Sequence, residues 1–396
     1  MKQSQVCIVG AGCIGLTLAL GLVKQGISVV VIDGAPRLSA PNSKAAEFSL
    51  RVSALSLASQ ALFMQLGVWQ AMVDLRAQPY TTMDVRDKDS FGKIEFVAQE
   101  QDLTHLGHIV ENDVIRHALL AALDEQPLAT VLFDSPYQQI HQSDSDVFLT
   151  LKDGTPIIAK LLVACDGANS AIRQQYKMPI TFWDYDHHAI VATIKTQLPH
   201  HNVARQVFLP DGPLAFLPLP EANTHSIVWS TSPMRAQALL AMDDSEFNKA
   251  LMAEFDGQCG LCEVVSARQS FPLKMRYARK WLDNRVILMG DAAHTIHPLA
   301  GLGMNLGLKD AAYLLELLAS ASTSSAQGEF APHKLLRQYE RGRKADAQTH
   351  IAMMQGLKEL FEGQHPLKKL IRGIGLNLVD NLSPLKQLFA DKALGQ

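Results

Sequence analysis

Glycine and aspartate residues near the start of the chain have the spacing of a dinucleotide-binding turn. Gly10, Gly12 and Gly15 form the pattern G-x-G-x-x-G directly after the apolar run Val6–Val9. Glycines at these positions permit a tight turn and a close approach of the backbone to a pyrophosphate, and the next helix N-terminus offers N–H groups to the anion. Asp33 follows Gly15 by 33 − 15 = 18 residues, near the spacing of an acid that accepts hydrogen bonds from ribose hydroxyls. The pattern predicts a dinucleotide site but does not distinguish NAD from FAD.

Aspartate and glycine recur beside two later apolar runs. Asp166 comes directly after Leu161–Cys165, and the pair Gly290-Asp291 follows another apolar run. A carboxylate at a strand end can accept hydrogen bonds from cofactor hydroxyls, although an aspartate there can also simply cap a turn. Only the combination with the first turn favours a cofactor role for these residues.

A fourth segment, Gly301-Leu302-Gly303-Met304-Asn305, precedes a long stretch with apolar residues at helical spacing. The backbone N–H groups of Gly303, Met304 and Asn305 therefore stand at a predicted helix N-terminus, where the helix dipole stabilises negative charge. Asn305 could alternatively be the N-cap of this helix.

In this order and at these separations, the motifs resemble the para-hydroxybenzoate hydroxylase class of single-component flavin monooxygenases over about residues 4–375. The resemblance implies non-covalent FAD. It places the first motif on the ADP half, Asp166 near the pyrophosphate and Asp291 on the ribitol chain. Arg51 and Glu111 fall on segments that lie near FAD in this class, although a surface ion pair or a helix cap is nearly as consistent with them. Leu302 replaces the usual glutamine, which keeps the backbone donors and removes a side-chain contact.

Four other segments resemble the ubiquinone-biosynthesis hydroxylases, most of all the branch that acts on ring carbon 5 of a 2-polyprenylphenol such as 2-octaprenylphenol. They are His105–Asn112, Thr181–Tyr185, Ala204–Phe208 and Ser226–Ser230. The resemblance implies that one oxygen atom of O2 passes from a flavin C4a-hydroperoxide to the phenol. NAD(P)H or another reductant would supply the electrons. Sister enzymes acting at other ring carbons share much of this pattern.

No residue can be assigned as the acid or base from the sequence. His294 and Pro298 are the candidates: a histidine can transfer protons near neutral pH, and the resemblance suggests that the backbone carbonyl of Pro298 shapes the site. We favour packing around the Gly-Asp turn for both His294 and His297.

Bulk composition describes an ordinary globular protein. Of the 396 residues, 47% are hydrophobic and 19% are charged, which fits two domains with a sizeable core. The net charge of −3 gives no general attraction to nucleic acid. Cys259-x-x-Cys262 lacks the further ligands of a zinc site, so we expect no metal. No signal peptide and no run of about 18 apolar residues is found, which predicts a cytoplasmic protein.

These motifs require an α/β fold that aligns strand ends. We expect a Rossmann-like FAD-binding domain, a mainly antiparallel β-sheet substrate domain inserted into it, and a helical C-terminus. The FAD-binding domain is predicted over 1–75, 105–180 and 276–345, the substrate domain over 76–104 and 181–275, and the helical region over 346–396.

Local patterns predict the individual elements. Val29–Ile32 reads as a strand, Ala54–Leu66 as a helix, and Asn112–Leu123 as a helix with Asn112 as N-cap. Asp153-Gly154 predicts a hairpin turn, and a helix is expected over Asp244–Phe255.

The last 32 residues, His365–Gln396, carry five Lys or Arg and two Asp, a net charge of 5 − 2 = +3. Their apolar residues recur at helical spacing, which fits an interfacial helix at a membrane surface and equally a helix docked on its own domain or on a partner. Peripheral association with the inner membrane, contacts with other ubiquinone-biosynthesis proteins and a homo-oligomer are therefore expectations.

Three other functions stay open at this point. A hydroxylase of a soluble aromatic acid predicts a compact polar pocket with an arginine for the carboxylate. An FAD-dependent reductase of the geranylgeranyl-reductase kind shares the glycine fingerprint. A non-catalytic flavoprotein scaffold would keep flavin without turnover.

Overall fold

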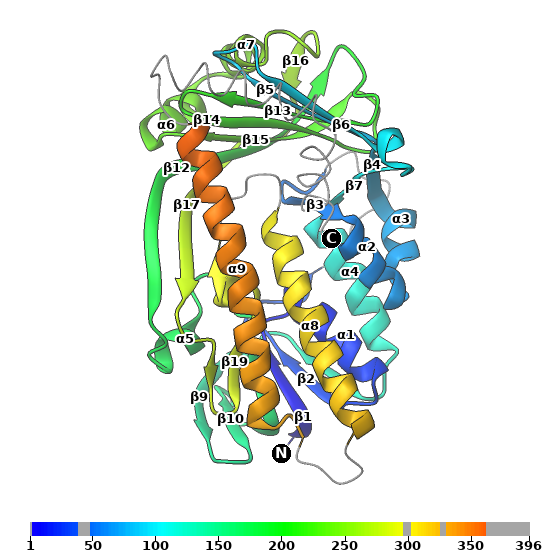
Figure 1. The fold of residues 1–396 in the computed structure, drawn as a ribbon, viewed down its shortest axis with the longest axis vertical. Helices are drawn as coiled ribbons and strands as arrows, with labels where there is room; N and C mark the ends of the chain where they lie inside the picture. The colour runs from blue at the N-terminus through cyan, green and yellow to red at the C-terminus, as the bar shows by residue number, and fades with distance from the viewer. Residues whose placement is uncertain (1, 39–47, 296–301, 325–329, 362–396) are drawn as a thin grey trace.

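The computed structural model describes residues 2–38, 48–295, 302–324 and 330–361. A sheet with a parallel centre occupies the lower half of Figure 1 and a second sheet the upper half, from which the long strands β12 (Ile180–Thr196) and β17 (Gln269–Ala278) extend downward. Most helices pack against the lower sheet. The predicted α/β class with a nucleotide-binding sheet and a second, mainly antiparallel sheet is confirmed.

The lower sheet has the strand order β18-β19-β11-β1-β2-β8, and a hairpin of β9 and β10 extends it beside β11. Strand β1 is central and pairs in parallel with both β2 and β11. Every residue of β2 is buried, as expected for a parallel strand that is covered on both faces. The strands are β1 (Lys2–Val9), β2 (Val29–Ile32), β8 (Ala129–Leu132), β9 (Tyr137–Gln142), β10 (Val147–Leu151), β11 (Pro156–Ala164), β18 (Leu282–Asp283) and β19 (Val286–Leu288).

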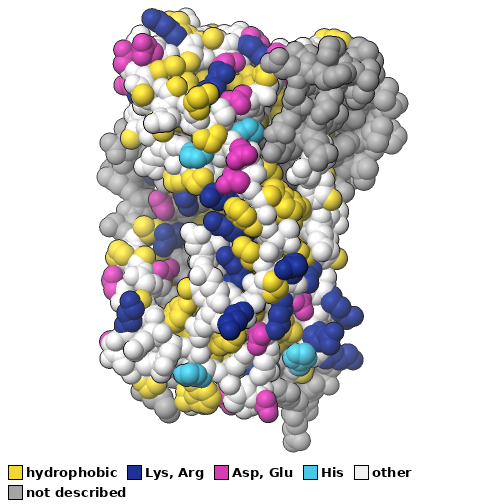
Figure 2. Space-filling model, turned by 90° about the vertical axis from the view of Figure 1, so that its left-hand side faces the viewer, with side chains coloured by type: hydrophobic (Ala, Val, Ile, Leu, Met, Phe, Trp, Pro, Cys, Tyr) yellow, Lys and Arg dark blue, Asp and Glu magenta, His cyan; other side chains and the backbone are white. Residues whose placement is uncertain are grey.

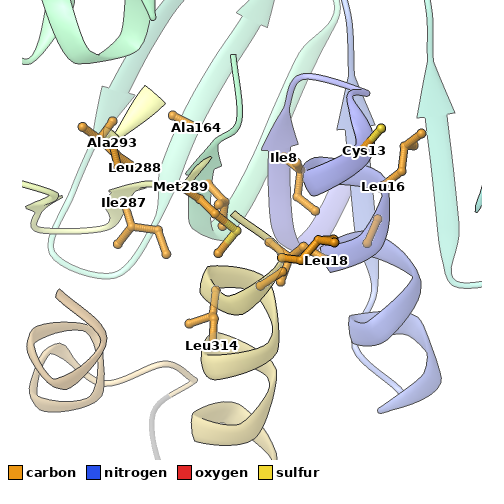
Figure 3. Packing of buried hydrophobic residues seen from close by; sticks show 14 of the residues in the cluster. Ile8, Cys13, Leu16, Leu18, Ala164, Ile287, Leu288, Met289, Ala293 and Leu314 are labelled. Carbon is orange, nitrogen blue, oxygen red and sulfur yellow. The ribbon is translucent and has the colours of Figure 1, made fainter. Parts of the chain in front are cut away.

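Two helices cover the sheet next to the cofactor motifs. Ile8 of β1, Leu18 of α1 and Leu314 of α8 belong to one cluster of buried apolar side chains (Figure 3). At Gly21 a Cβ would overlap the side chain of Leu315, so the two helices are in close contact at this point. Each fully buried leucine contributes roughly 1.5–3 kcal/mol to this core.

The described helices of the chain are α1 (Cys13–Lys24), α2 (Leu57–Gln65), α3 (Trp69–Arg76), α4 (Asn112–Asp124), α5 (Ala171–Gln175), α6 (Pro233–Ala241), α7 (Asp244–Glu254), α8 (Leu302–Ser324) and α9 (His333–Phe361), with short 3-10 turns η1 (Ala98–Gln101) and η2 (Gly290–Ala292).

The upper sheet has the order β20-β17-β12-β15-β14-β13-β5-β6, with β16 beside β12. Its pairs are antiparallel except that β13 runs parallel to β5. Helices α6 and α7 cover one face, where Phe216 stacks on Phe255 with ring centroids 3.7 Å apart. The remaining strands are β5 (Thr82–Asp87), β6 (Lys93–Val97), β13 (Val203–Leu209), β14 (Gly212–Pro218), β15 (Thr224–Thr231), β16 (Cys262–Val264) and β20 (His294–Thr295).

A small third sheet of β3 (Val52–Ser56), β7 (Gly107–Glu111) and β4 (Ala77–Tyr80) corrects one prediction. The segment expected to be helical from Ala54 is a strand up to Ser56, because it pairs with β7. The helix begins at Leu57, and the Ser56 side chain caps it by accepting a hydrogen bond from the N–H of Ser59. Local spacing could not reveal that pairing.

Other element predictions agree with the structure. The hairpin at Asp153-Gly154 joins β10 to β11, and Gly154 has the positive φ of 86° that favours glycine. The helix predicted from Asp244 is α7, and the helix predicted from Asn112 is α4. However, Asn112 is the first helical residue of α4, and Glu111 occupies the N-cap position. The predicted tail helix beyond residue 361 lies outside the described residues.

Candidate functional site

A cavity of about 1440 Å³ opens at the carboxyl ends of β1, β2, β11 and β19. This is where ligands of open α/β sheets bind. The volume exceeds the roughly 300–1,000 Å³ of ordinary small-molecule pockets. Residues of the upper sheet, Gln269 and Phe271, also line it, so the cavity reaches from the nucleotide-binding sheet to the second sheet.

The glycines of the first turn have different surroundings. Gly10 has φ 110°, and a Cβ there would overlap the carbonyl oxygen of Cys165. A Cβ on Gly15 would overlap the carbonyl oxygen of Gly10. At Gly12 a Cβ would have nothing within 4 Å, because this residue borders the cavity. Gly10 and Gly15 therefore permit the turn, and Gly12 leaves space for a ligand.

Helix α1 begins at this turn without a side-chain cap. Gly12 is its N-cap, and no side chain among the described residues caps the first N–H groups. Free N–H groups at a helix N-terminus bind phosphate. Arg116 of α4 also lines the cavity and donates from Nε to the carbonyl oxygen of Ala11 at 3.1 Å. The sequence reasoning missed Arg116, which stands inside a helix and belongs to none of the motifs.

Asp33 lines the cavity and supports the first turn. Its Oδ2 accepts from the N–H of Ala11 at 2.7 Å, and its Oδ1 accepts from the N–H of Ala35 at 2.8 Å. Each carboxylate oxygen retains a further acceptor site, so hydrogen bonding to ribose hydroxyls stays a prediction.

Asp166 has an oxygen with no protein partner. Its Oδ2 accepts from the N–H of Ile172 at 3.2 Å, whereas its buried Oδ1 has no hydrogen-bond partner among the described residues. An unpaired buried carboxylate oxygen is costly. A ligand that donates a hydrogen bond within the cavity would remove that cost, so Asp166 fits a cofactor with hydroxyl or N–H groups.

The Gly290-Asp291 turn is held from two directions. Gly290 adopts φ 60°, and its N–H donates to Asp310 Oδ2 at 3.0 Å. Arg173 of α5 donates to the carbonyl oxygen of Ala292 at 2.7 Å. Asp291 is exposed into the cavity, where the surrounding protein limits its hydration and raises its pKa, while His294 and Arg51 act in the opposite direction.

The start of α8 also reaches the cavity. Gly303 and Met304 line it, and a Cβ on Gly303 would meet nothing within 4 Å. The Asn305 side chain turns away instead. Its Oδ1 accepts from the Ser56 N–H at 3.0 Å and its Nδ2 donates to the Ala54 carbonyl at 2.8 Å. Asn305 is neither a helix cap nor a side-chain ligand in this arrangement. Gly301 lies outside the described residues.

Arg51 lines the cavity, and its contact with the cofactor stays a prediction. It is exposed at the cavity and its guanidinium lies 4.8 Å from the centre of the Phe271 ring. This cation–π contact joins the segment before β3 to β17 of the upper sheet. Phe271 carried no sequence signal, since it belongs to an ordinary strand pattern.

Glu111 does not line the cavity, and its contact with the cofactor stays a prediction. Glu111 is buried outside the cavity lining, with Oε1 accepting from the Ser49 N–H at 2.6 Å and Oε2 lying 3.0 Å from Arg76 Nε. Burial raises its pKa, and the Ser49 N–H and Arg76 oppose the rise. Glu111 therefore anchors the segment that leads to Arg51.

His294 is also away from the cavity lining, which agrees with the favoured packing role. It is 1% exposed, and its Nε2 lies 2.6 Å from Asp310 Oδ2. The other candidate, Pro298, lies outside the described residues together with His297. Among the described residues no group of three or more His, Cys, Asp or Glu side chains could hold a metal ion.

FAD fits the residues that are present. Gly12 and Gly303 leave open space, Asp166 offers an unpaired acceptor, and α1 offers uncapped N–H groups beside Arg116. Cys13 and Cys165 also border the cavity, and burial raises the pKa of the Cys13 thiol to about 12. Since the thiolate is the nucleophilic form, the raised pKa disfavours a reactive role for Cys13.

Comparisons with known proteins agree with this geometry. The model of a protein family described as an FAD binding domain matches residues 3–353. The ubiquinone hydroxylase UbiL of Rhodospirillum rubrum is 36% identical over 395 residues, covering 100% of this chain and 90% of the relative. The 3-demethoxyubiquinol 3-hydroxylase of Escherichia coli is 34% identical over 398 residues, covering 100% of this chain and 99% of the relative.

A solved structure shows the same fold. The p-nitrophenol 4-monooxygenase PnpA of Pseudomonas putida superposes with a TM-score of 0.79 at 20% identity, covering 100% of this chain and 99% of that protein. Within the described residues, no helix is both long enough and apolar enough to cross a bilayer.

Proposed function

The chain belongs to the family of FAD-dependent monooxygenases that contains the ubiquinone-biosynthesis hydroxylases, and from this premise we propose that it hydroxylates the ring of a polyprenylphenol at carbon 5. The observation that carries the proposal is that the cofactor motifs and the upper sheet border the same cavity. A cofactor and a ring can meet there without leaving the protein.

FAD, when bound and reduced, supplies the reaction with O2 that yields one oxygen atom for the ring. The residues of this chain bind FAD, orient the ring of the substrate and exclude water from the site. The residues that we assign to FAD are Gly10, Gly12, Gly15, Asp33, Arg51, Arg116, Asp166, Gly290, Asp291, Gly303 and Met304.

The position of Phe271 supports an aromatic substrate. This ring stands on β17 at the edge of the cavity and is packed against Arg51. Aromatic side chains pack favourably against other rings. We assign Phe271 and Gln269 to the substrate side because they come from the upper sheet, whereas the FAD residues other than Arg51 come from the lower sheet, its helices and the turns beside them.

A second ring position has specific support. The relative from Escherichia coli, at 34% identity, is named for hydroxylation at position 3 of 3-demethoxyubiquinol. The segments that resemble the carbon-5 branch favour carbon 5 here, and position 3 is the alternative. A soluble aromatic acid would need a cation to pair with its carboxylate. Arg51, whose guanidinium lies over the Phe271 ring, is the residue that would serve in that case.

We further propose that NAD(P)H is the electron donor. We also propose that the enzyme acts at the cytoplasmic surface of the inner membrane. A polyprenyl chain partitions into a bilayer at about 0.8 kcal/mol per buried CH₂, so the enzyme must meet its substrate at the membrane surface. Association with other ubiquinone-biosynthesis proteins and with a second copy of the chain belongs to the same proposal.

The test combines biochemistry with genetics. The purified protein is reconstituted with FAD, and O2 consumption is measured with NAD(P)H and a short-chain 2-prenylphenol. Separate rescue assays then use strains that lack the carbon-5 hydroxylase or the position-3 hydroxylase. We expect rescue of the first strain, and no rescue by Asp291→Ala. Rescue of only the second strain would reassign the ring position, and turnover of a soluble aromatic acid alone would overturn the proposal.

A further inference from the structure

A buried ionic cluster lies directly behind the Gly290-Asp291 turn and belongs to none of the cofactor motifs. Asp310 of α8 is 0% exposed. Its Oδ2 accepts from the Gly290 N–H at 3.0 Å and from His294 Nε2 at 2.6 Å, and its Oδ1 accepts from Arg343 Nε at 2.7 Å. One carboxylate therefore joins the cofactor turn, β20 and α9.

Arg343 completes the cluster from the last described helix. It is 6% exposed, and it also donates from Nη1 to Asp346 at 2.7 Å. Burial favours a raised pKa for Asp310, but His294 and Arg343 outweigh burial and the pKa is lowered. Asp310 is therefore ionised in the core, where removing its partner would leave a costly unpaired charge.

We propose that Asp310 and Arg343 are positioning residues for the flavin site, through which α9 sets the affinity for FAD. Asp310 fixes the N–H of Gly290, and the next residue, Asp291, faces the cavity. Gly290 adopts the left-handed conformation and opens the short 3-10 turn η2, in which the Ala293 N–H donates to the Gly290 carbonyl oxygen at 2.9 Å. Side chains connect this turn to the rest of the fold, with Asp310 on one side and Arg173 on the other.

Arg343 contacts α8 at two groups: its Nε donates to Asp310 Oδ1, and its Nη2 donates to the carbonyl oxygen of Leu306 at 3.4 Å. No described residue after Met304 lines the cavity, so α9 does not touch the ligand space. The Arg343 contact reaches it in two steps, from Nε to the carboxylate and from the carboxylate to Gly290. Displacements of about 1 Å at positioning groups have large effects on a site. The inference rests on FAD binding and is independent of the ring that is hydroxylated.

The test uses Arg343→Gln with Arg341→Gln as the matched control, because Arg341 is on the exposed side of the same helix. FAD binding to the full-length apoprotein is measured by flavin fluorescence. We expect the dissociation constant to rise about ten-fold or more for Arg343→Gln, equivalent to about 1.4 kcal/mol, and to stay unchanged for Arg341→Gln. The visible circular dichroism of the bound flavin should change only in the first variant.

A purely structural role predicts a different result. It would lower the melting temperatures of the apo and FAD-bound forms equally and leave the dissociation constant unchanged, which would overturn the proposal. A positioning role reduces the stabilisation that FAD confers. Should Arg343→Gln fail to fold, Arg343→Lys keeps the cation and is measured instead, with an intermediate loss of affinity expected. An unchanged dissociation constant in that folded variant would count equally against the proposal.

A double-mutant cycle tests the route. If Arg343 acts through Asp310, the effects of Arg343→Gln and Asp310→Asn on the FAD dissociation constant will not add, because the two residues share one contact. Full additivity would show that Arg343 acts by another path and would exclude the proposed coupling.

Discussion

At the scale of single residues, the cavity separates glycines that shape the backbone from one that leaves room for a ligand. Gly10 has a positive φ and sits against the Cys165 carbonyl, so the fold depends on it even without cofactor. Gly12 has φ −78° and an open side, so an alanine fits the fold there. The same motif thus contains a residue needed for folding and a residue needed for binding.

This difference gives a prediction for two alanine variants. Gly12→Ala should leave the free energy of unfolding of the apoprotein nearly unchanged and weaken FAD binding ten-fold or more, because its methyl group enters the space for the pyrophosphate. Gly10→Ala should cost roughly 1–3 kcal/mol or more of stability, since it adds strain at positive φ to an overlap with Cys165. Urea denaturation of the apoprotein and an FAD titration separate the two effects. Equal stability of both variants would contradict the prediction.

Residue types alone predicted the cavity-facing glycines and aspartates but not the buried polar contacts. Asp33, Asp166 and Asp291 line the cavity as the motifs predicted. Glu111 and Asn305 stand at predicted motif positions too, yet their side chains bond to backbone groups of segments distant in the chain. A carboxylate or amide at a strand end serves a ligand or a neighbouring loop equally well, and only the tertiary contacts decide which.

At the scale of elements, the first turn of α8 is fixed to the small third sheet. Asn305 connects it to the end of β3 through Ala54 and Ser56, and to α2 through Ser59 Oγ at 2.7 Å. The sequence could not reveal this because β3 was expected to be part of a helix. The pairing of β3 with β7, far along the chain, overrides the local pattern.

Removing this link should loosen the element that carries Gly303 and Met304. Asn305→Ala leaves the Ser56 N–H and the Ala54 carbonyl without their partner, which should cost about 2–6 kcal/mol at about 1–3 kcal/mol for each unsatisfied buried group. FAD affinity should fall in parallel, because α8 borders the cavity. The exposed amide variant Gln338→Ala on α9 is the control. A loss below 0.5 kcal/mol in urea denaturation would refute the structural role of Asn305.

At the scale of the whole molecule, charge is unevenly distributed. The net charge is −3, yet Figure 2 shows Lys and Arg side chains gathering over the lower half of one face. On α9, Lys334, Arg337 and Arg341 are exposed at spacings of three and four residues, and they form no ion pair with the described residues. The exposed cations of α9 provide a way to test the proposed membrane association with described residues alone.

Anionic vesicles should bind the protein through the exposed cations of α9. The double variant Arg337→Gln and Arg341→Gln should lower the partition coefficient about ten- to thirty-fold at low salt, at about 1 kcal/mol per cation near an anionic surface. Flotation with phosphatidylglycerol vesicles measures this, and Lys24→Gln with Lys249→Gln is the control on other exposed surfaces. Equal losses of vesicle binding in both double variants would show a general effect of charge and would contradict binding through α9.

Acid should destabilise the whole fold through buried histidines, chiefly His225 in the upper sheet. His225 is 0% exposed, and burial, followed by the charges of His200 and Arg205, lowers its pKa to about 3. The unfolded chain, with a histidine pKa near 6.5, binds a proton between those values while the folded chain does not. Stability from this residue is therefore complete above pH 6.5 and is lost as the pH falls toward 3.

Because protons bind preferentially to the unfolded chain, His225 should lower the free energy of unfolding by about 2 kcal/mol between pH 7 and pH 5. His225→Gln removes the titrating group, so its free energy of unfolding should fall less over this range than that of the original protein. The exposed residue His141 supplies the control variant His141→Gln, which should keep the full pH dependence. Some dependence will persist in His225→Gln, because burial also lowers the pKa of His108 to about 4. Urea denaturation at both pH values measures the difference, and identical slopes for all three proteins would contradict the assignment to His225.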